Sequence, residues 1–176
     1  LFHLRSESGM TLNQEQGIIR VGIADINIAY KDSIIRTAGL GSCVGVVLYN
    51  SSYKIAGMVH IMLPDSSLAR GNIFNKAKYA DTGILELISR LNEMGIKKQM
   101  LKAKIAGGAQ MFQFSTGSEL MRIGPRNVEA VKKILMKNHI QLVAEDVGGN
   151  SGRTIEFNPS TCILHIRTVN HGNRCI

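Results

Sequence analysis

The chain has 176 residues, a length that suits one domain with a hydrophobic core of its own. No apolar run approaches the roughly 20 residues of a membrane-spanning helix, and no charged segment leads into an apolar one near the start. The three cysteines, Cys43, Cys162 and Cys175, lack C-x-x-C spacing, which disfavours a disulfide framework or a zinc site. These features predict a cytoplasmic protein with free thiols.

The formal net charge of +8 raises the question of nucleic-acid binding. Aromatic residues make up only 5% of the chain and tryptophan is absent, so side chains that stack on bases are scarce. The basic residues occur in small groups, which are typical of solvated helix faces. We therefore predict no nucleic-acid partner, and note that a positive surface also suits an acidic protein partner.

The hydrophobic pattern predicts a mixture of strands and two helices. Runs rich in valine and isoleucine predict strands within residues 17–30, 44–49, 54–63, 102–108, 141–149 and 161–169. Apolar residues at helical spacing predict one helix within 75–95, stopped by Gly95, and another within 124–139, opened by Pro125. Because strands arrive in groups with few helices between them, the order favours an α+β fold.

The pattern also suggests the limits of the domain. We expect residues 10–170 to form a single domain. The stretch 1–9, before Met10, is expected to be appended or disordered sequence, and 171–176 to be a C-terminal tail.

Two of the predicted strands form a hairpin that brings a cysteine toward a histidine. The runs VGVVLY and KIAGMVH are separated by the polar loop NSSY. If the turn is centred between Ser51 and Ser52, Cys43 lies directly opposite His60 on one face of the sheet. A three-residue loop would shift the register and separate the pair.

A thiol beside an imidazole predicts nucleophilic catalysis. The histidine can accept the thiol proton and thereby depress the pKa of Cys43. Gly41 and Ser42, just before Cys43, are candidates to bring backbone N–H groups toward an oxyanion. The hydroxyl of Thr37 is a candidate to orient His60. A lone cysteine in an apolar strand is also typical of a small core residue, and this alternative stays open.

Several segments together resemble one known family. They are RTAGLGSCVGVVLYN, GMVHIMLPDS, KIAGGAQMF, IGPRNV and EDVGGNSGRTIEFNPSTC. In this order they resemble CheD, the chemoreceptor glutamine deamidase of bacterial and archaeal chemotaxis. The resemblance runs from about residue 21 to 169 and implies a β-sandwich flanked by helices in α/β/β/α layers.

The resemblance also implies an activity and a set of residues. It implies a cysteine-dependent protein-glutamine glutaminase, an amidohydrolase that converts receptor glutamines to glutamates with ammonia release, and possible hydrolysis of receptor methyl esters. Cys43 would be the nucleophile, His60 the general base and then acid, and Thr37 the orienting residue. No metal or organic cofactor is expected. The alternative is a noncatalytic chemotaxis adaptor that binds receptors and the phosphatase CheC.

A glycine-rich segment is expected to form a partner or substrate loop. It contains Gly107, Gly108, Met111 and Phe112, whose pattern by itself also suits a turn with a core aromatic residue. In the CheD family this region lies near the active site and meets CheC. The resemblance therefore implies chemoreceptor cytoplasmic helices and CheC as partners, without membrane insertion.

Overall fold

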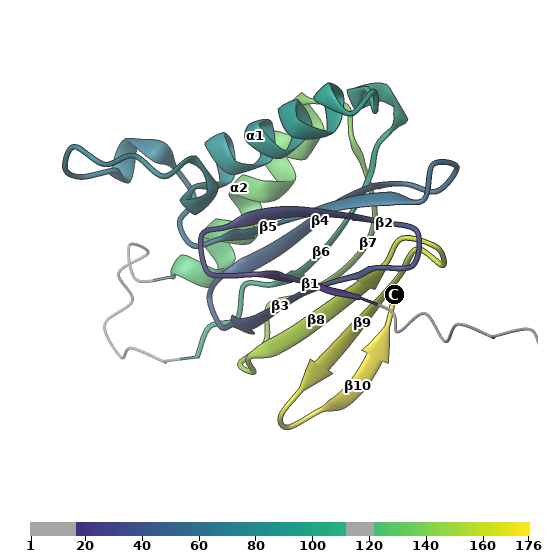
Figure 1. Cartoon of the computed structure of the whole chain (residues 1–176). Helices are drawn as coiled ribbons and strands as arrows, with labels where there is room; N and C mark the ends of the chain where they lie inside the picture. Colours follow the sequence, from purple (N-terminus) through teal and green to yellow (C-terminus); the bar gives the residue numbers. More distant parts are fainter. Residues whose placement is uncertain (1–16, 112–121) are drawn as a thin grey trace, which may run out of the picture.

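The structure is a computed structural model that describes residues 17–111 and 122–176. Within these ranges the chain forms ten strands and two α-helices, together with three short 3₁₀ turns (Figure 1). The strands are β1 (Ile18–Val21), β2 (Ile26–Tyr30), β3 (Ile34–Leu40), β4 (Val44–Asn50), β5 (Ile55–Ile61), β6 (Lys102–Gly107), β7 (Gln141–Val147), β8 (Arg153–Asn158), β9 (Ile163–Thr168) and β10 (Gly172–Cys175). The helices are α1 (Ala80–Glu93) and α2 (Ile123–Lys137).

The strands make two five-stranded sheets that face each other. The first sheet has the order β1-β3-β8-β9-β10 and the second has the order β2-β5-β4-β6-β7. The pairs β1–β3 and β6–β7 are parallel, whereas the other paired strands are antiparallel. Strands β4 and β5 lie inside the second sheet and are buried on both faces, which explains their nearly continuous apolar sequence.

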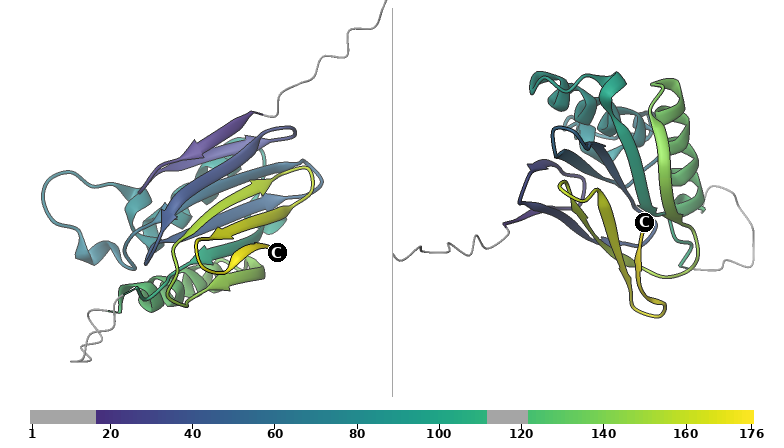
Figure 2. Two further views of the ribbon diagram at one scale, coloured as in Figure 1. Left: turned by 90° about the horizontal axis from the view of Figure 1, so that it is seen from below. Right: turned by 90° about the vertical axis from the view of Figure 1, so that its right-hand side faces the viewer.

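Both helices cover the outer face of the second sheet. Helix α1 packs mainly on β5, and α2 packs on β4, β6 and β7. Figures 1 and 2 show the first sheet on the opposite side of the second, away from the helices. The α+β sandwich is therefore confirmed, but the described residues form α/β/β layers. The expected fourth layer, a helix outside the first sheet, is absent from these residues because both amphipathic helices use the same sheet.

Two apolar clusters hold the layers together. One lies between the helices and the second sheet and includes Ile84, Leu87 and Leu91 of α1. The other, here called the inter-sheet cluster, lies between the two sheets. Its buried members are Val21, Ala29, Ile35, Leu40, Val47, Tyr49, Ala56, Met58, Ala106, Ile155, Phe157, Leu164 and Ile166. Strand β5 contributes to both clusters, so its successive side chains alternate between the helices and the first sheet.

The structure adds elements that the sequence pattern did not predict. Strands β3 and β8 lie in the middle of the first sheet, although both contain polar residues and β3 also contains Gly39. The predicted tail instead contains β10, which pairs with β9 after a turn in which the hydroxyl of Thr168 donates to the carbonyl of Gly172. Residues 1–9 lie outside the described residues. No helix in the described ranges is long and apolar enough to cross a membrane.

Candidate active site

Thr37 and His60 meet across the two sheets. Thr37 lies on β3 of the first sheet and His60 on β5 of the second, and the Thr37 Oγ1 atom is 2.8 Å from His60 Nδ1. The same oxygen is 2.8 Å from the carbonyl oxygen of Val21, which can only accept. The single hydroxyl proton of Thr37 therefore goes to Val21, and Thr37 accepts from the Nδ1–H of His60. This arrangement leaves the lone pair on His60 Nε2.

The imidazole is held as a neutral base. His60 is fully buried, and its Nε2 has no hydrogen-bond partner among the described residues. Burial lowers the pKa of His60 because the charged imidazolium is poorly solvated there. A buried, unpartnered nitrogen with a free lone pair is suited to accept a proton from a reacting group.

Cys43 lies just before β4, on the same face of the sheet as His60. Its half-buried side chain packs against the inter-sheet cluster. In the β4–β5 ladder Gly45 is opposite His60 and Val44 is opposite Ile61. Because side chains alternate along a strand, Cys43 shares the face of Gly45 and is a diagonal neighbour of His60.

The predicted direct pairing of Cys43 with His60 is therefore wrong by two residues. The turn comprises residues 51–54, so that Asn50 pairs with Ile55. Its geometry is fixed by the N–H of Tyr53, which donates to the side chain of Asn50, and by Lys54, whose φ is 50°. A shift of two residues keeps the side chains on the same face, because the side-chain period of a strand is two. The thiol and the imidazole thus remain neighbours despite the error.

The close approach of the two sheets at Gly45 lets Thr37 reach His60. A Cβ atom at position 45 would lie 2.6 Å from Ile155 Cδ1 and 3.3 Å from Leu40 Cδ1. It would also contact the methyl group of Thr37 at 3.6 Å. Sequence reasoning did not single out Gly45, although a glycine inside an apolar strand is a signal of close backbone approach.

The loop before Cys43 is braced by the predicted glycine-rich segment. The N–H of Gly108 donates to the carbonyl of Cys43 at 2.8 Å, and the N–H of Ala109 donates to the carbonyl of Gly41 at 2.8 Å. Gly107 has a φ of 117°, and a Cβ atom there would collide with the Cys43 carbonyl oxygen. Glycine is therefore required at position 107 both for its backbone conformation and for this contact.

The other predicted loop residues have different surroundings. The carbonyl oxygen of Ser42 accepts a hydrogen bond from Asn127 Nδ2, 2.9 Å away on α2, a contact that sequence reasoning did not foresee. Met111 is exposed, and a Cβ atom at Gly41 would lie 2.9 Å from its sulfur, so Met111 borders the loop of Cys43. Phe112 lies outside the described residues.

The surroundings of Cys43 favour its neutral thiol. Burial raises its pKa, and the hydrogen bond from its own backbone N–H lowers the pKa by a smaller amount. The expected depression of this pKa is therefore not found. Burial thus favours the uncharged form of both Cys43 and His60.

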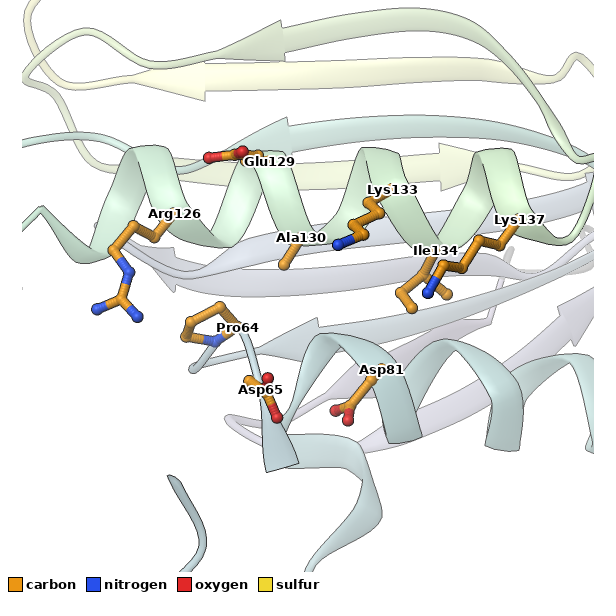
Figure 3. A pocket seen from close by; sticks show the side chains of 9 residues that line it. All are labelled: Pro64, Asp65, Asp81, Arg126, Glu129, Ala130, Lys133, Ile134 and Lys137. Atoms are coloured by element: carbon orange, nitrogen blue, oxygen red, sulfur yellow. The ribbon is translucent and has the colours of Figure 1, made fainter. Parts of the chain in front are cut away.

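A separate cavity of about 370 Å³ lies between the two helices, on the outer side of the second sheet (Figure 3). Its lining residues are Pro64, Asp65, Asp81, Arg126, Glu129, Ala130, Lys133, Ile134 and Lys137. Its polar groups serve the local structure in part: Asp81 accepts from Ser66, and the N–H of Ser67 donates to Asp65. The lining contains neither cysteine nor histidine, so this cavity lacks the groups of a thiol–imidazole site.

Comparison with known proteins identifies the family. The family described as CheD chemotactic sensory transduction matches residues 62–168. A chemoreceptor glutamine deamidase CheD of Halalkalibacterium halodurans is 59% identical over 157 residues, which are 89% of this chain and 97% of that protein. The chemoreceptor glutamine deamidase CheD of Bacillus subtilis is 54% identical over 162 residues, 92% of this chain and 98% of that protein.

The crystal structure of the Bacillus licheniformis hypothetical protein YfiH superposes with a TM-score of 0.39 at 13% identity, covering 75% of this chain and 59% of that one. The family match begins two residues after His60, so it is independent of Thr37, Cys43 and His60. It spans more than half of the chain, and the curated relatives are similar over nearly their whole length. The chain therefore belongs to the CheD family.

Proposed function

We propose that this protein is a chemoreceptor glutamine deamidase in which Cys43 is the nucleophile and His60 the general base. Two relatives above half identity carry this activity in their names. The observation that carries the catalytic assignment is the bond between Thr37 Oγ1 and His60 Nδ1, because it leaves Nε2 free on the face that also bears Cys43. The reaction is the hydrolysis of a side-chain amide.

The first half of the reaction forms a thioester. The Cys43 sulfur attacks the carbon of the glutamine side-chain amide while His60 Nε2 accepts the thiol proton. The carbonyl oxygen of the substrate becomes an oxyanion. When the intermediate collapses, the C–N bond breaks, the imidazolium gives its proton to the departing nitrogen, and ammonia leaves. The acyl group is then bound to the sulfur of Cys43.

The second half releases glutamate. Water attacks the thioester carbon while His60 Nε2 accepts a proton from that water. The C–S bond then breaks, the proton returns to the sulfur of Cys43, and the free carboxyl group leaves the site. One water is consumed and one ammonia is released for each glutamine, and no step requires a metal or an organic cofactor. A methyl ester presents the same carbonyl carbon with methanol as leaving group, so ester hydrolysis fits the same residues.

The oxyanion is stabilised by backbone N–H groups near the nucleophile. Gly41 and Ser42 form the loop before Cys43, and the carbonyls of this loop are tied to Ala109, Asn127 and Gly108. The N–H of Cys43 already favours a negative charge on its own sulfur. Because this N–H is directed toward the sulfur, it can also donate a hydrogen bond to the negatively charged oxygen of the substrate that develops beside it.

The partners are cytoplasmic helices of chemoreceptors and the phosphatase CheC, which places the protein in the cytoplasm. Met111 borders the Cys43 loop with half of its surface exposed, so it can contact a bound helix. Gly107 and Gly108 are buried, so in the proposed contact segment they support the Cys43 loop, and Phe112 of the same segment lies outside the described residues. The net charge of +8 suits an acidic protein surface.

The alternative function is a noncatalytic adaptor that binds receptors and CheC. A cysteine, an oriented neutral imidazole and a glycine-braced loop are not needed for binding alone, which favours the enzyme. Nucleic-acid binding is the third possibility, and it predicts affinity that falls steeply with salt.

The decisive experiment measures ammonia release from a purified chemoreceptor fragment in its glutamine form. The unaltered protein is compared with Cys43→Ala and His60→Ala, and with Cys175→Ser as a control that removes an exposed thiol away from the site. Peptide mass spectrometry locates the converted glutamines. We expect release with the unaltered protein and the control only. Full release without Cys43 would refute the nucleophile, and tight binding without any release would favour the adaptor.

A further inference from the structure

Asn127 occupies a position in α2 that its neighbours fill with apolar side chains. Together with Val131 and Leu135 it forms the buried stripe of the helix at a spacing of four residues. Asn127 is fully buried where α2 passes Ser42, just before β4, and Met62, just after β5. An amide side chain in this stripe therefore requires a reason other than packing.

The reason lies in the two protons on its side-chain nitrogen. Asn127 Nδ2 is 2.9 Å from the carbonyl oxygen of Ser42 and 2.9 Å from that of Met62. Both partners can only accept, so the orientation of the amide is fixed. Its oxygen, Oδ1, is buried without a partner among the described residues. The side chain is thus used as a double donor, which neither aspartate nor leucine could replace.

One of these bonds controls the peptide that precedes the nucleophile. The described part of the chain has no cis peptide bonds, so the C=O of Ser42 and the N–H of Cys43 point in opposite directions from one rigid plane. Holding that C=O toward α2 turns the N–H of Cys43 away from α2. The same N–H is the backbone group that lowers the pKa of the Cys43 thiol, so its direction also matters for the sulfur.

We propose that Asn127 is a positioning residue that sets the Ser42–Cys43 peptide so that the N–H of Cys43 faces the thiolate and the substrate oxyanion. Its second bond, to Met62, links this loop to the strand end that follows His60. The spacing of nucleophile and base is thereby held by one side chain. This inference rests on the proposed function, because it assigns a partner to the same Cys43 and His60.

The test uses the full chain with Cys162→Ser and Cys175→Ser, so that Cys43 is the only thiol. Asn127→Ala removes both donors, and Asn127→Ser keeps a hydroxyl that can donate once. Asn138→Ala is the matched control, because Asn138 Nδ2 donates at 2.8 Å to the carbonyl of Ile134 at the far end of the same helix. For each folded variant, purified by gel filtration, kcat and KM for ammonia release and the pH dependence of Cys43 alkylation by iodoacetamide are measured.

We expect Asn127→Ala to lower kcat by at least about tenfold with KM changed by less than about twofold, since loss of one complete oxyanion donor costs about 100-fold or more. The alkylation profile should move to higher pH, because the thiolate loses its aligned N–H. Asn127→Ser should have a kcat and an alkylation profile between those of the unaltered side chain and Asn127→Ala. Asn138→Ala should leave both kcat and the alkylation profile unchanged.

Equal kcat and an unchanged alkylation profile in Asn127→Ala would overturn the proposal, and so would failure of both Asn127 variants to fold, since the role would then be purely structural. The alkylation profile does not depend on deamidation. If the parent chain releases no ammonia, the proposed function fails separately.

Discussion

Replacing Thr37 with valine tests the orientation of His60, the proposed catalytic base. Valine has nearly the shape of threonine but lacks the hydroxyl. The change removes the bond from His60 Nδ1–H to Thr37 Oγ1 and the bond from Thr37 to the carbonyl of Val21, both 2.8 Å long. Since Thr37 is only 1% exposed, water cannot readily replace the lost group.

The structure sets the size of the effect on stability and on rate. Two buried polar groups lose their partner, each at a cost of about 1 to 3 kcal/mol, so the free energy of unfolding should fall by about 2 to 6 kcal/mol. A hydrogen bond worth about 1.4 kcal/mol shifts an equilibrium tenfold. Losing the bond that selects the Nδ1–H tautomer should therefore lower kcat by up to about tenfold, because the fraction of molecules with the lone pair on Nε2 can fall by at most that factor.

The assay is ammonia release from the glutamine-form receptor fragment, with kcat expressed per folded molecule and stability measured by urea denaturation. Thr37→Ser is the control, because it keeps the hydroxyl and should retain kcat within about threefold. KM should change little in either variant. If Thr37→Val loses stability but keeps its kcat, Thr37 supports only the fold, and the argument about the tautomer of His60 is refuted.

Three further changes follow from the surroundings of the site. Because burial lowers the pKa of His60 below its unfolded value, the free energy of unfolding should be highest above pH 6.5 and fall as the pH drops below it; His60→Gln should weaken this dependence in urea titrations. Gly107→Ala should cost more than about 2 kcal/mol and lower kcat, because its Cβ would collide with the Cys43 carbonyl. Arg153→Met should cost about 3 kcal/mol, because the carbonyls of Gly107 and Gly148 would lose a donor and Asp146 would keep only its pair with the exposed Arg174.

Matched variants separate these effects from general instability. Gly95 has a φ of 88° with no atom within 4 Å of its added Cβ, so Gly95→Ala should cost only the backbone strain of about 1 kcal/mol. Glu156 forms a half-exposed pair with Arg36, and Glu156→Gln should cost less than about 1 kcal/mol. If Gly95→Ala lowered the free energy of unfolding as much as Gly107→Ala, or Glu156→Gln as much as Arg153→Met, the local explanations would be contradicted. For His60, an unchanged pH dependence in His60→Gln would do the same.

The helices and the inner strands could be predicted because their sequences carry a single strong period. Strands β4 and β5 are apolar throughout, and α1 and α2 each have one buried stripe. Strand β8 was missed although Ile155 and Phe157 alternate correctly, because polar residues occupy every other position. Strand β3 contains a register shift between Thr37 and Leu40, and no local pattern reveals such a bulge.

The site could be predicted in part because a register error of two residues does not move a side chain to the other face of a sheet. The expected turn was displaced, yet a shift of two residues kept Cys43 and His60 on one face. The pKa of Cys43 could not be predicted, since it depends on burial between two sheets that are distant in sequence. The role of Asn127 could not be predicted either, because its side chain donates to the carbonyls of Ser42 and Met62, which are distant in sequence.

In the proposed mechanism, the burial of Cys43 and His60 also explains how the site avoids a permanently reactive thiol. A preformed thiolate would react with any electrophile that reached it, whereas a neutral Cys43 beside a neutral His60 becomes nucleophilic only when the proton transfers. The protein must then stabilise the charges when they form. The N–H of Cys43 can do this for sulfur and for the substrate oxygen, and the Thr37 oxygen for the imidazolium through Nδ1–H. Rigid placement of these groups is consequently as important for the rate as the nucleophile itself.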